Sequence, residues 1–193
     1  MTTVLLTGFE PFGTATSNPS GEIVKQISGD SIVTAILPVA YAGSAEQLLA
    51  LIAEHNPDVV ICLGQAEGRT QITPEKVAIN LDDARLADNE GVLRKDVKIL
   101  ENGPDAYFTT LPVNKMVEAI KAKGVPAAVS LSAGAFLCNH VFYVAQSKLA
   151  GTKVRSGFVH VPLMDSQAPE FPGLPTMPLD QMVKAVRAML EVL

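Results

Sequence analysis

The sequence predicts a single α/β domain, a three-layer α/β/α sandwich around a mostly parallel, twisted sheet. Short runs rich in Val and Ile alternate with helical patterns along the chain. The strand-like runs are apolar throughout, which is typical of strands that are buried on both faces of a parallel sheet. The length of 193 residues suits one domain over residues 1–193.

The predicted strands are short and rich in β-branched residues, and Gly, Pro, Asp or Asn flanks many of them. They cover residues 3–8, 31–39, 58–64, 76–81, 126–132 and 154–162. Because ligands of such sheets bind beyond the carboxyl ends of the strands, we expect a site where these strands end.

The predicted helices cover residues 18–27, 44–55, 112–124, 138–151 and 178–193. The first has Asn18 at its N-cap position and Pro19 at its first helical position. Gly124 ends the third helix. The polar stretch 82–96 and the proline-rich stretch 168–178 are predicted to be loops.

Composition excludes several classes of partner. The formal net charge of −5 does not favour nucleic acid or an anionic membrane surface. No segment approaches the ~20 apolar residues of a membrane span, and the N-terminus lacks the basic region of a signal peptide. Cys62 and Cys138 give no disulfide framework and no zinc-ligand spacing. We therefore expect a cytoplasmic protein without a metal or cofactor.

Cys138 is the first candidate for chemistry. It stands in SAGAFLCNH, at a predicted strand-to-helix turn. Free N–H groups at a helix start lower the pKa of a thiol and can bind an oxyanion. The alternative is that Cys138 only packs as a small apolar side chain. Cys62, inside the apolar strand VVICLG, is predicted to be inert.

A thiol nucleophile needs a histidine as its base. His160 lies near the end of the apolar strand GFVHVP, at the sheet edge where Cys138 should also open. Histidines in such strands are more often core residues, but the other two fit less well. His140 is two residues from Cys138 on the same helix and cannot face it. His55 ends a surface helix.

The imidazole in turn needs an orienting acid. Glu75 enters an apolar strand, where a carboxylate without a partner would cost several kcal/mol. Asp88 is its rival, with Asp82 and Asp83 further behind. A solvated loop acid is the alternative role for each of them.

These residues belong to four motifs that occur in order along nearly the whole chain. The motifs are LLTGFEPFG followed by NPS, GQAEGRTQITPEKVAINLDDARLADNEG, AVSLSAGAFLCNHVFY and GFVHVPLMDSQ. With them, the sequence resembles pyroglutamyl-peptidase I, or pyrrolidone-carboxylate peptidase, a family of cytosolic cysteine exopeptidases. The resemblance implies hydrolysis of an N-terminal pyroglutamyl residue through a thioester, without a cofactor. It also implies a homo-oligomer, a dimer or a tetramer.

The resemblance assigns roles to individual residues. It makes Cys138 the nucleophile, His160 the base and Glu75 the third member of the triad, and it places Arg85 at the oxyanion. Its substrate-binding positions are Phe9, Phe12, Asn18, Gln65, Phe136 and Leu137. The sequence departs from the family pattern at three positions, where it has Glu67, Ala87 and Leu131.

Substrate choice depends on the two phenylalanines of GFEPFG. Pyroglutamate is a flat, neutral lactam that needs apolar faces and a few hydrogen bonds, and these rings can supply the faces. Two alternatives remain at this stage. A phosphorylase-like enzyme on a similar fold would need a phosphate-binding loop, which GFEPFG is not. A catalytically silent binding protein would keep the triad without using it.

Overall fold

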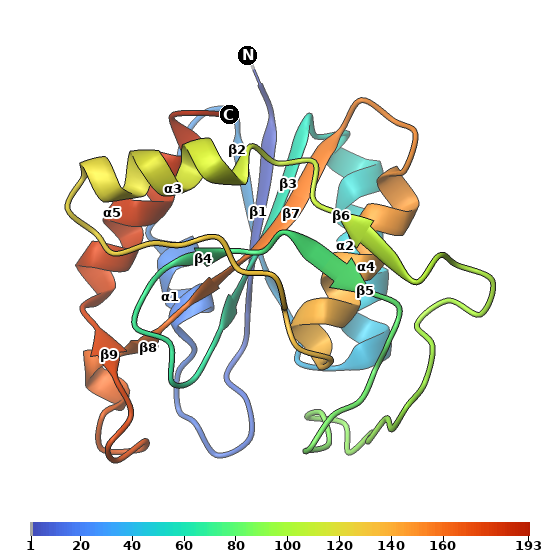
Figure 1. Ribbon diagram of the computed structural model, residues 1–193, viewed down its shortest axis with the longest axis horizontal. Coiled ribbons are helices and arrows are strands. Elements are labelled where there is room, and N and C mark those ends of the chain that lie inside the picture. The colour runs from blue at the N-terminus through green and yellow to red at the C-terminus, as the bar shows by residue number, and fades with distance from the viewer. Residues whose placement is uncertain (1) are drawn as a thin grey trace.

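A five-stranded sheet forms the middle layer of the computed structural model, which describes residues 2–193 (Figure 1). The strand order is β2-β1-β3-β7-β4. The strands are β1 (Val4–Phe9), β2 (Ile32–Leu37), β3 (Val59–Gln65), β4 (Thr73–Pro74) and β7 (Arg155–Val161). All neighbours are parallel except β4, which is antiparallel to β7. The predicted α/β class with a mostly parallel sheet is confirmed.

Helices cover both faces of the sheet (Figure 1). One layer contains α1 (Pro19–Lys25), α3 (Val113–Ala122) and α5 (Leu179–Leu190), and the other contains α2 (Tyr41–His55) and α4 (Leu137–Leu149). Each layer buries its own apolar cluster against the sheet. This two-sided burial explains why the central strands read as unbroken apolar runs.

The helix ends show which local signals the chain uses. Asn18 caps α1 as predicted, since its side chain accepts a hydrogen bond of 3.0 Å from the backbone N–H of Ser20. The helix predicted from residue 44 begins earlier, at Tyr41. There the carboxylate of Asp88, from a distant loop, accepts the Tyr41 N–H at 2.9 Å. A cap supplied by a distant loop cannot be read from local sequence.

Two of the predicted strands differ in the structure. Residues 76–81 do not join the central sheet, because β5 (Val77–Ile79) pairs with β6 (Ala106–Phe108) in a separate antiparallel ribbon. The prediction of a strand over residues 126–132 is wrong. That segment makes isolated bridges, Ala127 to Ile72 and Ser130 to Glu75, and its backbone hydrogen-bonds with residues 72–76. Pro74 has no N–H to donate, so the ladder is interrupted there.

The chain after β7 forms small elements beside the carboxyl edge of the sheet. These are β8 (Leu163–Met164), the short 3-10 helix η1 (Asp165–Gln167) and β9 (Thr176–Met177), which pairs with β8. The stretch 168–178 is otherwise irregular, as predicted. Among the described residues, no helix is long and apolar enough to cross a membrane.

Candidate active site

Cys138 lies in the first turn of α4, and its side chain is partly exposed. No side chain caps this helix start, where Phe136 is the N-cap residue. The N–H groups of the first turn have no partner within a helix. The thiol is therefore placed beside free backbone donors, as the sequence predicted.

A glycine brings the sulfur of Cys138 against the sheet. A Cβ atom at Gly64, near the end of β3, would lie 2.8 Å from Sγ of Cys138 and 2.7 Å from the ring of Phe158. Gly64 is the register partner of His160 on β7. Phe158 and His160 are two residues apart on β7, so their side chains point to the same face, and their ring centroids lie 4.9 Å apart. The sulfur, which packs against β3, and the imidazole, which belongs to β7, therefore lie on the same face of the sheet.

His160 and Glu75 form a buried pair. Nδ1 of His160 lies 2.8 Å from Oε1 of Glu75, and the two residues are 4% and 0% exposed. The backbone N–H of Glu75 donates to the carbonyl of Phe158, which fixes the acid beside β7. With Nδ1–H donating to the carboxylate, Nε2 carries the lone pair that can accept a proton.

Arg69 is the residue of this group that the sequence reasoning missed. Its guanidinium lies 2.7 Å from the same Oε1 of Glu75, contacts the hydroxyl of Thr73, and donates to the carbonyl of Ser132 at 3.0 Å. Arg69 thus holds the acid and ties it to the loop that leads to Cys138. A signal was available, since a buried carboxylate needs a partner and Arg69 stands six residues before Glu75.

The resting charge state differs from the sequence prediction. Burial raises the pKa of the Cys138 thiol to about 12, and the nearby Glu75 carboxylate adds to the rise. Arg69 and the backbone at Cys138 act in the opposite direction but do not outweigh burial. Burial also lowers the pKa of His160, against the effect of Glu75. Both directions favour a neutral thiol and a neutral imidazole in the unliganded protein, against the thiolate that the helix start predicts.

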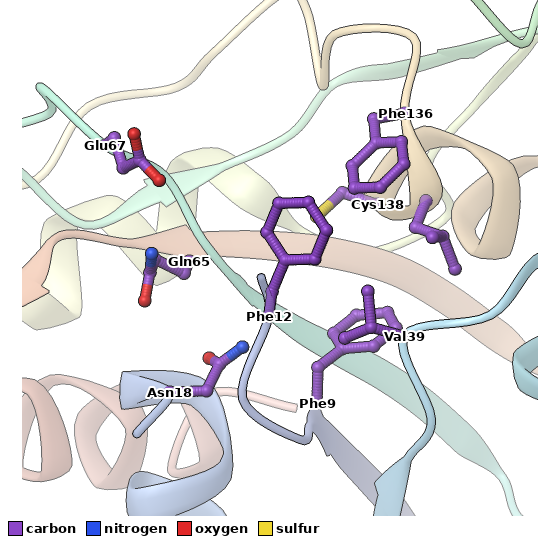
Figure 2. A pocket seen from close by; sticks show the side chains of 9 residues that line it. Phe9, Phe12, Asn18, Val39, Gln65, Glu67, Phe136 and Cys138 are labelled. Atoms are coloured by element: carbon purple, nitrogen blue, oxygen red, sulfur yellow. The ribbon is translucent and has the colours of Figure 1, made fainter. Parts of the chain in front are cut away.

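The thiol opens into a hollow of about 140 Å³ (Figure 2). Apolar side chains form most of its walls, and the rings of Phe12 and Phe136 stand 5.3 Å apart. Its lining contains all six predicted substrate-binding residues and adds Val39 and Glu67 to them. The full set is Phe9, Phe12, Asn18, Val39, Gln65, Glu67, Phe136, Leu137 and Cys138.

Hydrogen bonds orient the amide of Gln65. The backbone N–H of Met164 donates to Oε1 of Gln167 at 2.9 Å, so the amide nitrogen of Gln167 faces the other way. That nitrogen donates to Oε1 of Gln65 at 3.0 Å, which leaves Nε2 of Gln65 as a free donor. Gln167 ends the fourth motif, but nothing in its sequence context indicates this role.

Asn18 contributes less to the hollow than its position suggests. Its Oδ1 accepts hydrogen bonds from the N–H and hydroxyl of Ser20, and its Nδ2 donates to the carbonyl of Glu10 at 2.9 Å. Only the second amide hydrogen remains for a ligand. The main role of Asn18 is to fix the start of α1 beside the site.

Arg85 lies outside this hollow. It is exposed and lines a neighbouring hollow that shares Phe12 and Phe136 with the first. Asp83 lines the same neighbouring hollow and pairs with Lys95 at 3.4 Å. In this conformation, the Phe12 and Phe136 rings form a wall between Arg85 and the thiol hollow.

The rival acids and histidines have other partners. Asp88 caps α2 and also accepts the N–H groups of Glu90 and Val92. Asp82 is buried and binds His140 at 2.9 Å and Arg94 at 2.7 Å, which ties its loop to α4. These contacts explain both residues structurally.

Two further observations bear on the other candidates. The side chain of His55 is 31% exposed at the end of α2. Within residues 2–193, no group of three or more His, Cys, Asp or Glu side chains is arranged to hold a metal ion.

A sequence model described as pyroglutamyl peptidase matches residues 2–193. The chain belongs to the pyroglutamyl peptidase family. The resemblance given by the four motifs is thus confirmed, and membership makes the chain a cysteine-type peptidase. The matches do not support the phosphorylase-like and silent-binding alternatives.

Individual family members are similar over nearly their whole length. The pyrrolidone-carboxylate peptidase of Bacillus cytotoxicus is 43% identical, over 100% of this chain and 93% of its own. That of Cupriavidus pinatubonensis is 47% identical, over 97% and 90%.

Solved structures from the family have the same fold. The crystal structure of pyroglutamyl peptidase I from Bacillus amyloliquefaciens superposes with a TM-score of 0.94 at 45% identity, over 97% of this chain and 92% of that one. A variant of pyrrolidone carboxyl peptidase from Pyrococcus furiosus gives a TM-score of 0.91 at 37% identity, over 98% and 97%.

Proposed function

We propose that this chain hydrolyses the bond between an N-terminal pyroglutamyl residue and the rest of a peptide, with Cys138 as nucleophile. The observation that carries the proposal is that His160 on β7 pairs with Glu75, on the sheet face where the thiol packs against Gly64. Family membership supports the reaction, and the apolar hollow beside the thiol supports the substrate class.

Catalysis begins from the neutral pair. As the Cys138 sulfur attacks the pyroglutamyl carbonyl carbon, the thiol proton passes to Nε2 of His160, and Glu75 stabilises the resulting imidazolium. The imidazolium then protonates the leaving amine as the C–N bond breaks, which leaves a thioester. Water, giving a proton to His160, attacks the thioester and releases pyroglutamate, and the proton returns to the sulfur.

The helix start supplies the oxyanion site. The backbone N–H of Cys138 and its neighbours in the first turn of α4 have no helical partner and surround the carbonyl oxygen during attack. One such donor is worth about 3 kcal/mol of transition-state stabilisation. The proposed help from Arg85 requires its side chain to move from the neighbouring hollow past Phe136.

The lining explains why a lactam would be chosen. Phe9, Phe12 and Phe136 offer apolar faces to a flat ring, and the free Nε2 of Gln65 can donate to its carbonyl. Charged residues are absent from the apolar part of the lining, so a free α-amine would be desolvated there without a partner. An ordinary aminopeptidase substrate, whose α-amine would have to enter this apolar part, is therefore disfavoured.

Compartment and assembly are also proposals. Cys62 and Cys138 are both free, and a peptidase that depends on a thiol suits a reducing cytoplasm. Exposed apolar side chains, among them Phe108 and Leu131, support a homo-oligomer, a dimer or a tetramer.

A substrate series with two cysteine variants tests the function. We expect rapid release of the arylamine from a pyroglutamyl arylamide and little from the prolyl or glutaminyl arylamide. Cys138→Ala should abolish this activity, while the matched variant Cys62→Ala, which removes the other free thiol, should retain it. Equal cleavage of the three arylamides would refute the proposed substrate class. Full activity in Cys138→Ala would refute the mechanism.

A further inference from the structure

We propose that Glu67 selects substrates by charge, favouring peptides in which a cationic residue follows the pyroglutamyl residue. The inference rests on the proposed function and specifies its substrate class. It follows from the charge of the lining, the geometry of one turn, and the direction in which a bound peptide must leave the hollow.

Glu67 is the one residue with a formal charge in the lining of the thiol hollow. It is exposed, and within residues 2–193 its carboxylate has no ion pair and no hydrogen bond. The nearby cation is already neutralised, since Arg69 binds Glu75 at 2.7 Å. The mouth of the hollow therefore has an uncompensated negative charge that the catalytic mechanism does not use.

A fixed turn presents this carboxylate. The N–H of Arg69 donates to the carbonyl of Ala66 at 3.3 Å, and Gly68, with φ of +79°, takes the left-handed position that a type II turn requires. The residue before the turn, Gln65, ends β3, and the residue that closes it, Arg69, is anchored to Glu75. Both ends of the turn are thus held by the sheet and the catalytic acid.

The hollow has an apolar part and a polar part. In Figure 2, Phe9 and Val39 lie below the Cys138 sulfur, while Glu67 lies apart from them, to its left. A neutral ring is accommodated against the apolar side chains, since burial beside a carboxylate would desolvate that charge. Of the described residues that line the hollow, Glu67 alone is exposed, so it marks the mouth. With the scissile carbonyl at the sulfur, the rest of the peptide therefore leaves past Glu67.

The size of the effect follows from the exposure of Glu67. Charge pairs at exposed positions are weak, so we expect a Lys side chain to raise kcat/KM about two- to fivefold over Ala at the same position. A Glu side chain should lower it by a similar factor. Because exposed charges are screened, the discrimination should shrink as the Debye length falls from ~30 Å at 0.01 M salt to ~3 Å at 1 M.

The experiment compares three peptide amides, pyroglutamyl-lysine amide, pyroglutamyl-alanine amide and pyroglutamyl-glutamate amide. The amides remove the terminal carboxylate, so the side chain alone sets the charge. We expect the order Lys, Ala, Glu in kcat/KM for the wild type at low salt. Glu67→Gln should bring the three values together, and Glu67→Lys should reverse the order.

Glu118→Gln is the matched control, because Glu118 is an exposed acid on α3, in the helix layer on the other face of the sheet. It makes the same change in net charge and should keep the wild-type order. Ratios between substrates cancel any loss of folded protein in a variant. A wild-type order that is flat at low salt, or unchanged in Glu67→Lys, would overturn the inference. Cleavage of the alanine peptide tests the proposed function separately, since that substrate carries no side-chain charge.

Discussion

The Cys138 sulfur occupies the space that a side chain at position 64 would fill. β3 reaches the catalytic edge through Leu63, Gly64 and Gln65, and only the middle residue faces α4 and His160. A hydrogen atom at this position lets the helix start approach the strand. Gly64 therefore sets the distance between a thiol on one element and an imidazole on another.

Gly64→Ala should damage catalysis more than folding. Its methyl group would lie 2.8 Å from the sulfur, so either the first turn of α4 or Phe158 must move. A displacement of about 1 Å at a reacting atom costs about 10²-fold in rate, and overpacking costs about 1–3 kcal/mol of stability. The measurements are kcat on the pyroglutamyl arylamide and the free energy of unfolding. Gly29→Ala, where the new methyl group meets only the flexible side chain of Ile32, is the control. Unchanged kcat in Gly64→Ala would contradict this geometry.

At the residue scale, the sequence predicts the three residues of the proposed triad but not the residues that hold them in place. Cys138, His160 and Glu75 are predictable candidates because chemistry restricts the residue types and the predicted sheet edge restricts the positions. Arg69 and Gln167 act through single contacts to other side chains, at 2.7 Å to Glu75 and 3.0 Å to Gln65. Such contacts depend on side-chain directions that no spacing rule predicts.

At the scale of elements, two effects compete at the start of α4. The helix N-terminus favours a thiolate, whereas burial between α4, β3 and β7 favours the neutral thiol. The pKa of Cys138, raised to about 12, indicates that burial dominates. The negative charge of Glu75 raises this pKa further. In the proposed mechanism, the thiolate therefore forms only as the proton moves to His160 during attack.

The reactivity of the free thiol should follow this order of effects. We expect alkylation of Cys138 by iodoacetamide to be slow at neutral pH. The rate should keep rising with pH and should not level off below pH 8.5, the approximate pKa of a free cysteine thiol. The rate is measured by mass spectrometry across a pH series, with Cys138→Ala to show that Cys62 is not labelled. A plateau on the acidic side of neutrality would instead indicate a preformed thiolate.

Burial lowers the pKa of the His160 imidazole, which keeps the ring neutral to lower pH. Because the pKa of His160 is lowered from 6.5, the ring stays neutral and able to accept a proton when the pH falls to that value. The acidic limb of kcat/KM should therefore lie below pH 6.5 in the same series. A limb above that value would mean that Glu75 outweighs burial at His160.

Elements were predictable where one periodicity dominates. β1, β3 and β7 are predictable because two helix layers bury them, which makes their sequences apolar throughout. The helices are predictable because each has an apolar stripe that faces the sheet. Residues 126–132 and 76–81 have the same strand-like composition but lie beyond the central sheet or beside its shortest strand. Composition indicates an extended, buried segment, and does not say which partner it pairs with.

For the whole molecule, the site depends on how the two helix layers meet one sheet edge. α1 and the Phe12 loop come from one strand end, Gln65 from a second and His160 from a third, while α4 supplies the thiol from the opposite layer. The strands converge because parallel strands end at the same edge. A second surface lies at the edge of the sheet formed by its last strand, β4. The β5–β6 ribbon and residues 126–132 are found there.

The surface beside β4 has exposed apolar side chains that could form the contact between copies of the chain. Phe108 is 69% exposed and Leu131 is 73% exposed. Their backbones lie close to Lys76, since Phe108 pairs with Val77, and Leu131 follows Ser130, whose carbonyl accepts the Lys76 N–H. Two large exposed apolar side chains near one sheet edge favour contact with another copy of the chain.

The double variant Phe108→Glu with Leu131→Glu should therefore weaken the homo-oligomer. Burying two carboxylates in a contact between copies costs several kcal/mol, which is enough to shift a dimer or tetramer toward monomer at micromolar concentration. Light scattering coupled to gel filtration gives the mass. Leu93→Glu, which adds a charge at another exposed apolar position, is the control and should keep the wild-type mass. A wild-type monomer would refute the assembly, and an unchanged mass in the double variant would place the interface elsewhere.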